Sequence, residues 1–200
     1  MIILMYQIYT TEGFILRTSV FGETDCFYSI LTRDFGFIRA EAKGVRKLNG
    51  KLRYFLSDFS LVELSLVKGR EKWRITSANS NRNIFFELRG DKQAQIFLAR
   101  VSGLLIRLLN GEEKNGRLFE HVRNAALFLA ENRPSGAVLQ SLEYLLVLRI
   151  LYSLGYLGSS PDWSVFTSSA LFETGLLMKI EESKRQAIRS INQSLKESHL

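Results

Sequence analysis

Short segments of alternating apolar and polar residues fill the first third of the chain and limit its possible folds. Five such segments occur before residue 80, and no helical segment of normal length separates them. Turn residues such as Arg33-Asp34-Phe35-Gly36 and Lys68-Gly69-Arg70-Glu71 interrupt the alternation. The strands that this pattern predicts are Gly13–Thr18, Cys26–Thr32, Phe37–Lys43, Phe59–Val67 and Lys72–Thr76. Five short strands over roughly 70 residues predict a small closed β-barrel.

The apolar period becomes helical after about residue 81. Apolar residues then recur at spacings of three and four, which is typical of amphipathic helices. The predicted helices are Gln93–Leu109, Arg117–Glu131, Ala137–Leu154 and Gly175–Ser198, with a serine-rich linker at Gly158–Ser169. Ala137–Leu154 is apolar nearly all round, so we expect it to be the central helix of a bundle. The predicted fold class is α+β, with a barrel domain over residues 1–80 and an all-α helical domain over residues 81–200.

Basic residues are concentrated in the barrel segment. The net charge is +7, and residues 1–82 contribute +5 of it. From Arg39 to Arg53 there are six Lys or Arg residues and one acid. This predicts an anionic partner, either nucleic acid or a lipid surface, although a charge bias that only aids solubility is the plainer alternative. No window approaches the roughly 20 apolar residues of a membrane span, and the basic clusters lie in strands and a loop, so no membrane partner is expected.

The candidate nucleic-acid contacts follow from the predicted strand faces. In a small barrel of this kind, the second and third strands and the nearby loops form the usual nucleic-acid face. Phe37 shares the outward face of its strand with cations and is the candidate for base stacking, with a place in the core at one end of the barrel as its alternative. The predicted cationic contacts are Arg39, Lys43, Arg46, Lys47, Lys51, Arg53, Lys72 and Arg74. With six phosphate contacts, a plot of log affinity against log salt concentration would have a slope of about −5 on duplex DNA.

Catalytic and metal-binding patterns are missing from the sequence. There is no H-E-x-x-H, no G-x-x-x-x-G-K-[ST] and no G-x-S-x-G. Cys26 is the single cysteine, which excludes an intramolecular disulfide and a cysteine-based zinc site and fits a reducing cytosolic setting. Glu23 and Asp25 precede a strand, where a turn role is favoured over acid–base chemistry. We therefore expect no enzyme activity, no cofactor and no metal.

Several motifs, in order and spacing, resemble the bacterial RecO family of DNA repair proteins. The resemblance is dense over residues 12–78 and looser over residues 83–158. The motifs are Glu12–Arg17, Phe21–Asp25, Leu31–Gly36, Ala42–Lys47, Phe59–Leu64, Lys68–Arg70 and Leu148–Tyr156.

The resemblance implies an N-terminal OB-fold, a helical domain and a recombination mediator that is not an enzyme. Proteins of this family bind single- and double-stranded DNA, anneal complementary strands and, with RecR, help to load the recombinase onto DNA coated by single-strand-binding protein. The acidic C-terminal tail of single-strand-binding protein is the implied partner of a groove on the helical domain. Localisation in the cytoplasm, at the nucleoid, is implied as well.

This sequence departs from the family pattern in two places. Many members have four zinc-binding cysteines after the Leu-Gly-Tyr segment, whereas this chain has Gly158-Ser159-Ser160-Pro161-Asp162-Trp163. We therefore expect a short form without zinc. The basic loop has Leu48-Asn49-Gly50-Lys51 in place of the usual Pro-Lys-Ser. A general RNA-binding OB module and a protein-binding adaptor remain as alternative functions.

Overall fold

The computed structural model of the chain describes residues 7–47, 50–70, 72–157 and 161–197. The chain divides into two compact units. The barrel unit contains residues 1–87 and 109–114, and the helical unit contains residues 88–108 and 115–200. We expected the boundary between the two domains near residue 80. That position lies within the fifth strand, Trp73–Asn83, which continues beyond its alternating apolar residues.

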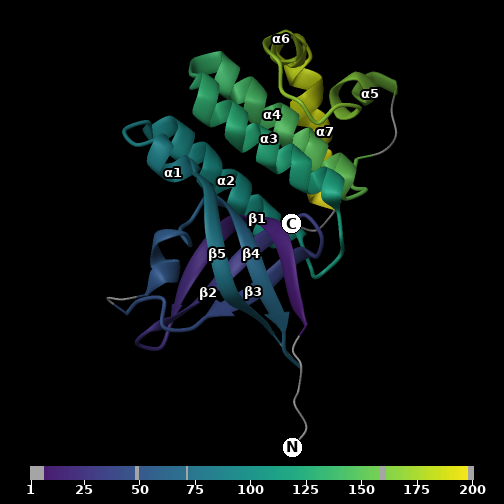
Figure 1. Cartoon of the computed structure of the whole chain (residues 1–200). Helices are drawn as coiled ribbons and strands as arrows, with labels where there is room; N and C mark the ends of the chain where they lie inside the picture. Colours follow the sequence, from purple (N-terminus) through teal and green to yellow (C-terminus); the bar gives the residue numbers. More distant parts are fainter. Residues whose placement is uncertain (1–6, 48–49, 71, 158–160, 198–200) are drawn as a thin grey trace, which may run out of the picture. The chain divides into compact units, whose positions relative to one another are not determined.

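Five strands form the closed barrel of the first unit (Figure 1). They are β1 (Ile8–Phe21), β2 (Asp25–Thr32), β3 (Gly36–Ala42), β4 (Ser60–Lys68) and β5 (Trp73–Asn83). Their order around the barrel is β1-β2-β3-β5-β4, and β3 pairs with β5 in parallel through Ala40 and Trp73. A 3-10 helix, η1 (Lys51–Tyr54), lies in the loop between β3 and β4, and the short helix α1 (Ile84–Glu87) follows β5. The predicted OB-type barrel followed by helices is confirmed.

The barrel closes because β1 is long enough to pair on both sides. Its residues from Ile8 to Phe14 pair with β4, and those from Gly13 to Phe21 pair with β2. The register shifts between Ile15 and Arg17, and this bulge allows the strand to bend. The inward-facing residues, including Ile30, Ile38, Leu64 and Ile75, form one buried cluster. The sequence predicted a strand only over residues 13–18, the middle of β1, because the bulge interrupts the two-residue alternation of apolar and polar side chains.

Residues 109–114 return to the barrel and lie against the β2–β3 turn. Gly36 has a φ of 67°, and a Cβ at this position would lie 2.1 Å from the Glu113 carbonyl oxygen. Ion pairs join Lys114 to Asp34 at 3.1 Å and Lys68 to Glu112 at 2.6 Å. Only glycine fits both the backbone angle and the close approach at Gly36.

The helical unit is built around α4 (Gly136–Ser153), whose leucines are buried as the sequence predicted. The other helices are α2 (Lys92–Leu108), α3 (Gly116–Asn132), α5 (Pro161–Thr167), α6 (Thr174–Glu182) and α7 (Lys184–Glu197). Two predictions were wrong. The expected linker at 158–169 contains α5, since Trp163 and Phe166 are buried, and the expected last helix is broken at Ser183. No helix in the described part of the chain is long and apolar enough to cross a membrane.

Candidate nucleic-acid interface

Cationic side chains from three strands lie on the outer face of the barrel. Arg17 on β1 pairs in register with Ser29 on β2, which pairs with Arg39 on β3, so the two arginines share one row of the sheet. Lys72 forms an ion pair of 2.8 Å with Glu41 of β3, which places it on the same face. The residues that we call the cationic face are Arg17, Arg39, Lys43, Lys72 and Arg74. All five are exposed.

The basic loop after β3 is fastened to the β1–β2 turn. The Gly44 backbone N–H donates to the Asp25 carboxylate at 2.8 Å, and the Arg46 N–H donates to the Thr24 carbonyl at 3.0 Å. The Arg46 guanidinium donates to the Glu23 carbonyl at 3.1 Å. The hydrogen bond from Gly44, followed by that from Thr24, lowers the pKa of the Asp25 carboxyl. Asp25 thus has the turn role that its position indicated, and it orders the basic loop.

Most of the predicted cations form no ion pair with a neighbouring carboxylate. Arg39, Lys43, Lys47, Arg53 and Arg74 form no ion pair with any residue that the structure describes. Lys72 is different because its ammonium group forms an ion pair with the buried carboxylate of Glu41. Arg46 contacts carbonyl oxygens, which leave its positive charge in place. The electrostatic condition for attracting a polyanion is therefore met at several neighbouring positions.

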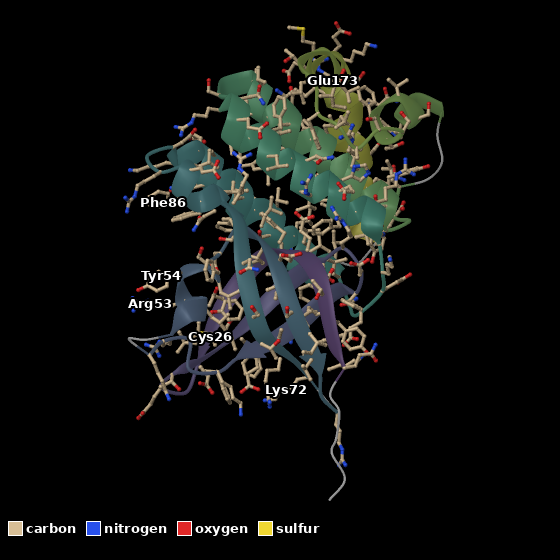
Figure 2. All side chains as sticks on the ribbon, viewed as in Figure 1. Cys26, Arg53, Tyr54, Lys72, Phe86 and Glu173 are labelled. Atoms are coloured by element: carbon tan, nitrogen blue, oxygen red, sulfur yellow. The ribbon has the colours of Figure 1, made fainter. Side chains whose placement is uncertain are left out.

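Two of the predicted contacts belong to η1 rather than to the cationic face. Figure 2 shows Arg53 and the adjacent Tyr54 pointing away from the barrel on the side of η1, and both are exposed. Lys51 begins η1, but its side chain lies outside the described residues. Lys72 lies at an end of the barrel, apart from these two residues in the same view (Figure 2).

Phe37 is not available for base stacking. Its residue is 6% exposed, so its ring does not offer a face to solvent. It pairs with Leu31, which pairs in turn with Phe14, and all three residues are buried in one row at one end of the barrel. The prediction of a stacking role was wrong, because alternation with charged residues identifies the outer side of a strand but not whether that side is covered.

The sequence interpretation missed Arg17 of the cationic face and two aromatic residues near that face, Phe21 and Phe27. Arg17 lies beyond the bulge in β1, so its face was not apparent from a period of two. Phe21 is half exposed at the end of β1, and Phe27 is partly exposed on β2. Their rings form an edge-to-face pair with centroids 4.8 Å apart. The only sequence signal for this pair was the placement of two phenylalanines across a tight turn.

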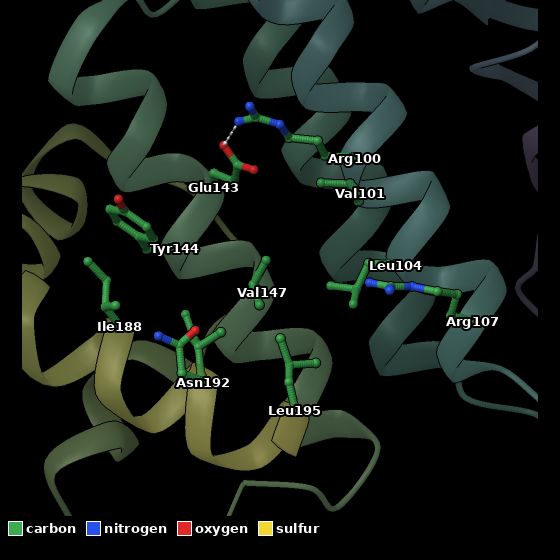
Figure 3. A pocket seen from close by; sticks show the side chains of 11 residues that line it. Arg100, Val101, Leu104, Arg107, Glu143, Tyr144, Val147, Ile188, Asn192 and Leu195 are labelled. Carbon is green, nitrogen blue, oxygen red and sulfur yellow. Dashed lines mark ion pairs between the residues drawn. The ribbon is translucent and has the colours of Figure 1, made fainter. Parts of the chain in front are cut away.

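The helical unit contains a groove between α2, α4 and α7, with a volume of about 250 Å³ (Figure 3). Its apolar wall includes Leu104, Val147 and Ile188. Arg100 and Arg107 lie at its α2 side, and Arg100 forms an ion pair of 3.5 Å with Glu143. Arg107 is exposed and forms no ion pair with a described residue.

The residues of the chain do not fit a four-cysteine zinc site. The single cysteine, Cys26, is buried in the barrel (Figure 2). No group of three or more His, Cys, Asp or Glu residues suited to a metal was found among the described residues. The segment after α4 is held differently. The buried Arg149 donates to the carbonyls of Phe166 at 2.8 Å and Leu171 at 3.0 Å.

Comparison with known proteins agrees with this architecture. Residues 5–83 match the family described as Recombination protein O N terminal. The chain is 34% identical over 109 residues to the DNA repair protein RecO of Alkaliphilus metalliredigens, covering 54% of this chain and 44% of the relative. It is 31% identical over 160 residues to the DNA repair protein RecO of Nostoc sp., covering 79% of this chain and 52% of the relative.

A closed five-stranded barrel with a cationic outer face, followed by a helical unit, defines an OB-fold protein with a helical domain. The matches are more specific, and they show that the chain belongs to the RecO family. The chain spans about half the length, or less, of the curated relatives that it matches.

Proposed function

We propose that this chain is a DNA-binding recombination mediator of DNA repair that binds single- and double-stranded DNA without catalysing a covalent step. The barrel would hold the strands, promote their annealing and, with RecR, assist loading of the recombinase. The activity would take place in the cytoplasm, at the nucleoid. The curated relatives of this chain carry the name DNA repair protein RecO, which supports the repair assignment.

One observation carries this proposal: the cationic face and the neighbouring loop hold several cations that form no ion pair with any described carboxylate. Arg39 and Arg74 lie on the adjacent strands β3 and β5, Lys43 directly follows β3, and Lys47 lies on the loop that Asp25 fastens. A phosphate backbone can satisfy several of these charges at once and release its counterions on binding. An isolated protein obtains no comparable stabilisation from collecting like charges on one surface.

A salt titration with charge-reversed variants tests the proposal. Replacing Arg39, Lys43 and Arg74 with Glu should weaken DNA binding at least about tenfold and reduce the log–log salt slope on duplex by about 3. The control reverses Arg185, Arg189 and Lys196 on α7, which are exposed and change the net charge equally. Equal losses in both triple variants would indicate a non-specific effect of net charge and would contradict the proposal.

The alternative functions give different results in the same assay. A general RNA-binding module would prefer an RNA oligomer over a DNA oligomer of equal length in direct competition. A protein-binding adaptor would keep its weak DNA affinity unchanged when the cationic face is reversed. Reversal at Arg46 is less informative, because this arginine also holds the β1–β2 turn.

The helical groove is our candidate site for the acidic tail of single-strand-binding protein. Leu104, Val147 and Ile188 offer an apolar wall, and Arg107 offers an uncompensated positive charge beside it. A peptide with apolar and acidic residues would complement both features. Arg107→Glu should abolish binding of a synthetic tail peptide in a fluorescence assay, whereas Arg185→Glu, outside the groove lining, should not. Equal binding by both variants would place the tail elsewhere.

A further inference from the structure

The pair of phenylalanines on the β1–β2 hairpin has no role in the barrel core. Neither Phe21 nor Phe27 belongs to the buried cluster that fills the barrel. Phe21 is 51% exposed although it is a large apolar side chain. Its ring lies edge-to-face with that of Phe27, with centroids 4.8 Å apart. This contact holds the Phe21 ring while leaving part of its surface open to solvent.

Cations lie around this aromatic pair. The Lys72 ammonium lies 5.4 Å from the centroid of the Phe27 ring. Phe21 is the register partner of Asp25, and the charges of Lys43 and Lys47 lie near enough to Asp25 to help lower the pKa of its carboxyl. An aromatic surface next to phosphate-binding cations is the arrangement that binds unpaired nucleotides, since the base stacks while its phosphate meets the charge.

The hairpin that presents Phe21 is held in place before any ligand arrives. Its turn accepts hydrogen bonds from the Arg46 N–H and guanidinium, and Asp25 accepts one from Gly44. A surface aromatic on a fastened turn loses less conformational entropy on binding than one on a free loop. The ring is therefore preorganised for stacking.

We propose that Phe21, held by Phe27, is a stacking platform for an unpaired nucleobase and makes the cationic face favour single strands over duplex. This inference rests on the proposed nucleic-acid binding of that face. Bases inside a duplex are already stacked on their neighbours, so they cannot use the ring, whereas the cations can contact either form of DNA.

The test compares three ligands: a thymidine oligomer, an abasic oligomer of the same length and a duplex. Phe21→Ala should weaken binding of the thymidine oligomer about fivefold or more, because stacking contributes about this much per base. Binding of the abasic oligomer and the duplex should change by less than about twofold. Phe21→Trp, which keeps an aromatic ring, should bind the thymidine oligomer about as well as the wild type. Val20→Ala is the matched control, since Val20 is 65% exposed on the same strand and has no aromatic ring.

The outcomes separate this inference from the proposed function. Equal losses for all three ligands, or no loss for the thymidine oligomer, would overturn the stacking platform while salt-dependent binding by the wild type still stood. A wild-type protein that binds none of the three ligands would overturn both. Because Phe21 is half exposed, Phe21→Ala should unfold at nearly the wild-type temperature. An unchanged unfolding temperature would show that any lost affinity comes from the missing ring and not from a loss of the fold.

Discussion

The Asp25 carboxylate accepts a hydrogen bond from the backbone N–H of Gly44 across a gap of 2.8 Å, joining the β1–β2 turn to the loop that carries the basic residues. Gly44 has a φ of 65°, a left-handed conformation that glycine adopts without strain. Residues 19 positions apart are thus fixed to one another at the edge of the candidate interface. An acidic residue positions the cations here, although it carries the opposite charge.

Two substitutions at Asp25 separate its charge from its hydrogen bond. Asp25→Asn and Asp25→Ala remove the same charge, but only asparagine keeps an oxygen that can accept from Gly44. We expect the alanine variant to bind DNA several-fold more weakly than the asparagine variant, because the basic loop is no longer fastened. Fluorescence anisotropy at fixed salt measures the difference. Equal affinities would show that the fastening does not contribute to binding.

The same contact predicts a pH dependence of loop order. The pKa of Asp25 is lowered in the folded protein, so its contribution to stability is present above the ordinary pKa of an aspartate and is lost as the pH falls through the folded value. Hydrogen exchange of the Gly44 amide should accelerate, after correction for the intrinsic rate, as the carboxyl is protonated in acid. In Asp25→Asn, protection of this amide should not change over the same pH range.

Phe37 should behave as a buried side chain and not as a ligand contact. Phe37→Ala should lower the free energy of unfolding by about 3–5 kcal/mol, and Phe37→Leu by less than about 1.5 kcal/mol. Urea denaturation measures both values. The ratio of single-strand to duplex affinity in Phe37→Leu should equal that of the wild type. A selective loss of single-strand binding would restore Phe37 as a stacking residue.

Arg149 should be essential for the order of α5 and the segment after it. Burial, with a smaller contribution from Arg117, lowers the pKa of Arg149 to about 10, so it remains charged at neutral pH. Arg149→Met would leave the Phe166 and Leu171 carbonyls without this donor and should cost about 2–4 kcal/mol of unfolding free energy. Arg149→Lys should also destabilise, because an ammonium lacks the fork of a guanidinium. Arg107→Met is the exposed control, and wild-type stability in Arg149→Met would refute this role.

His121 should make stability fall in mild acid. Burial, followed by the charges of Arg149 and Arg117, lowers the pKa of His121 to about 3 from an ordinary 6.5. Between these values the unfolded chain binds the extra proton, so stability decreases as the pH falls from about 6.5 toward about 3. From pH 7 to pH 5 this group should cost about 2 kcal/mol. Urea denaturation at both pH values should show that cost in the wild type and not in His121→Leu.

The sequence by itself determined the order and type of most elements. Alternation around Ile30 and Ile38 predicted strands because only one side of each strand enters the barrel core, and the leucines of α4 predicted a central helix because they recur on all its sides. The concentration of charge from Arg39 to Arg53 was also evident, since it requires only counting. These features depend on residues near one another in the chain.

Tertiary structure alone decided which outward-facing residues stay exposed. Phe37 and Phe27 each share one side of a strand with polar residues, yet Phe37 is buried and Phe27 contributes to a partly exposed aromatic pair. The bulge after Ile15 turned Arg17 to the face of Arg39, and the expected linker contains a helix whose Trp163 and Phe166 are buried. Each outcome depends on contacts between residues distant in sequence. A local pattern contains no information on such contacts because it records the side that a residue faces and not what lies opposite it.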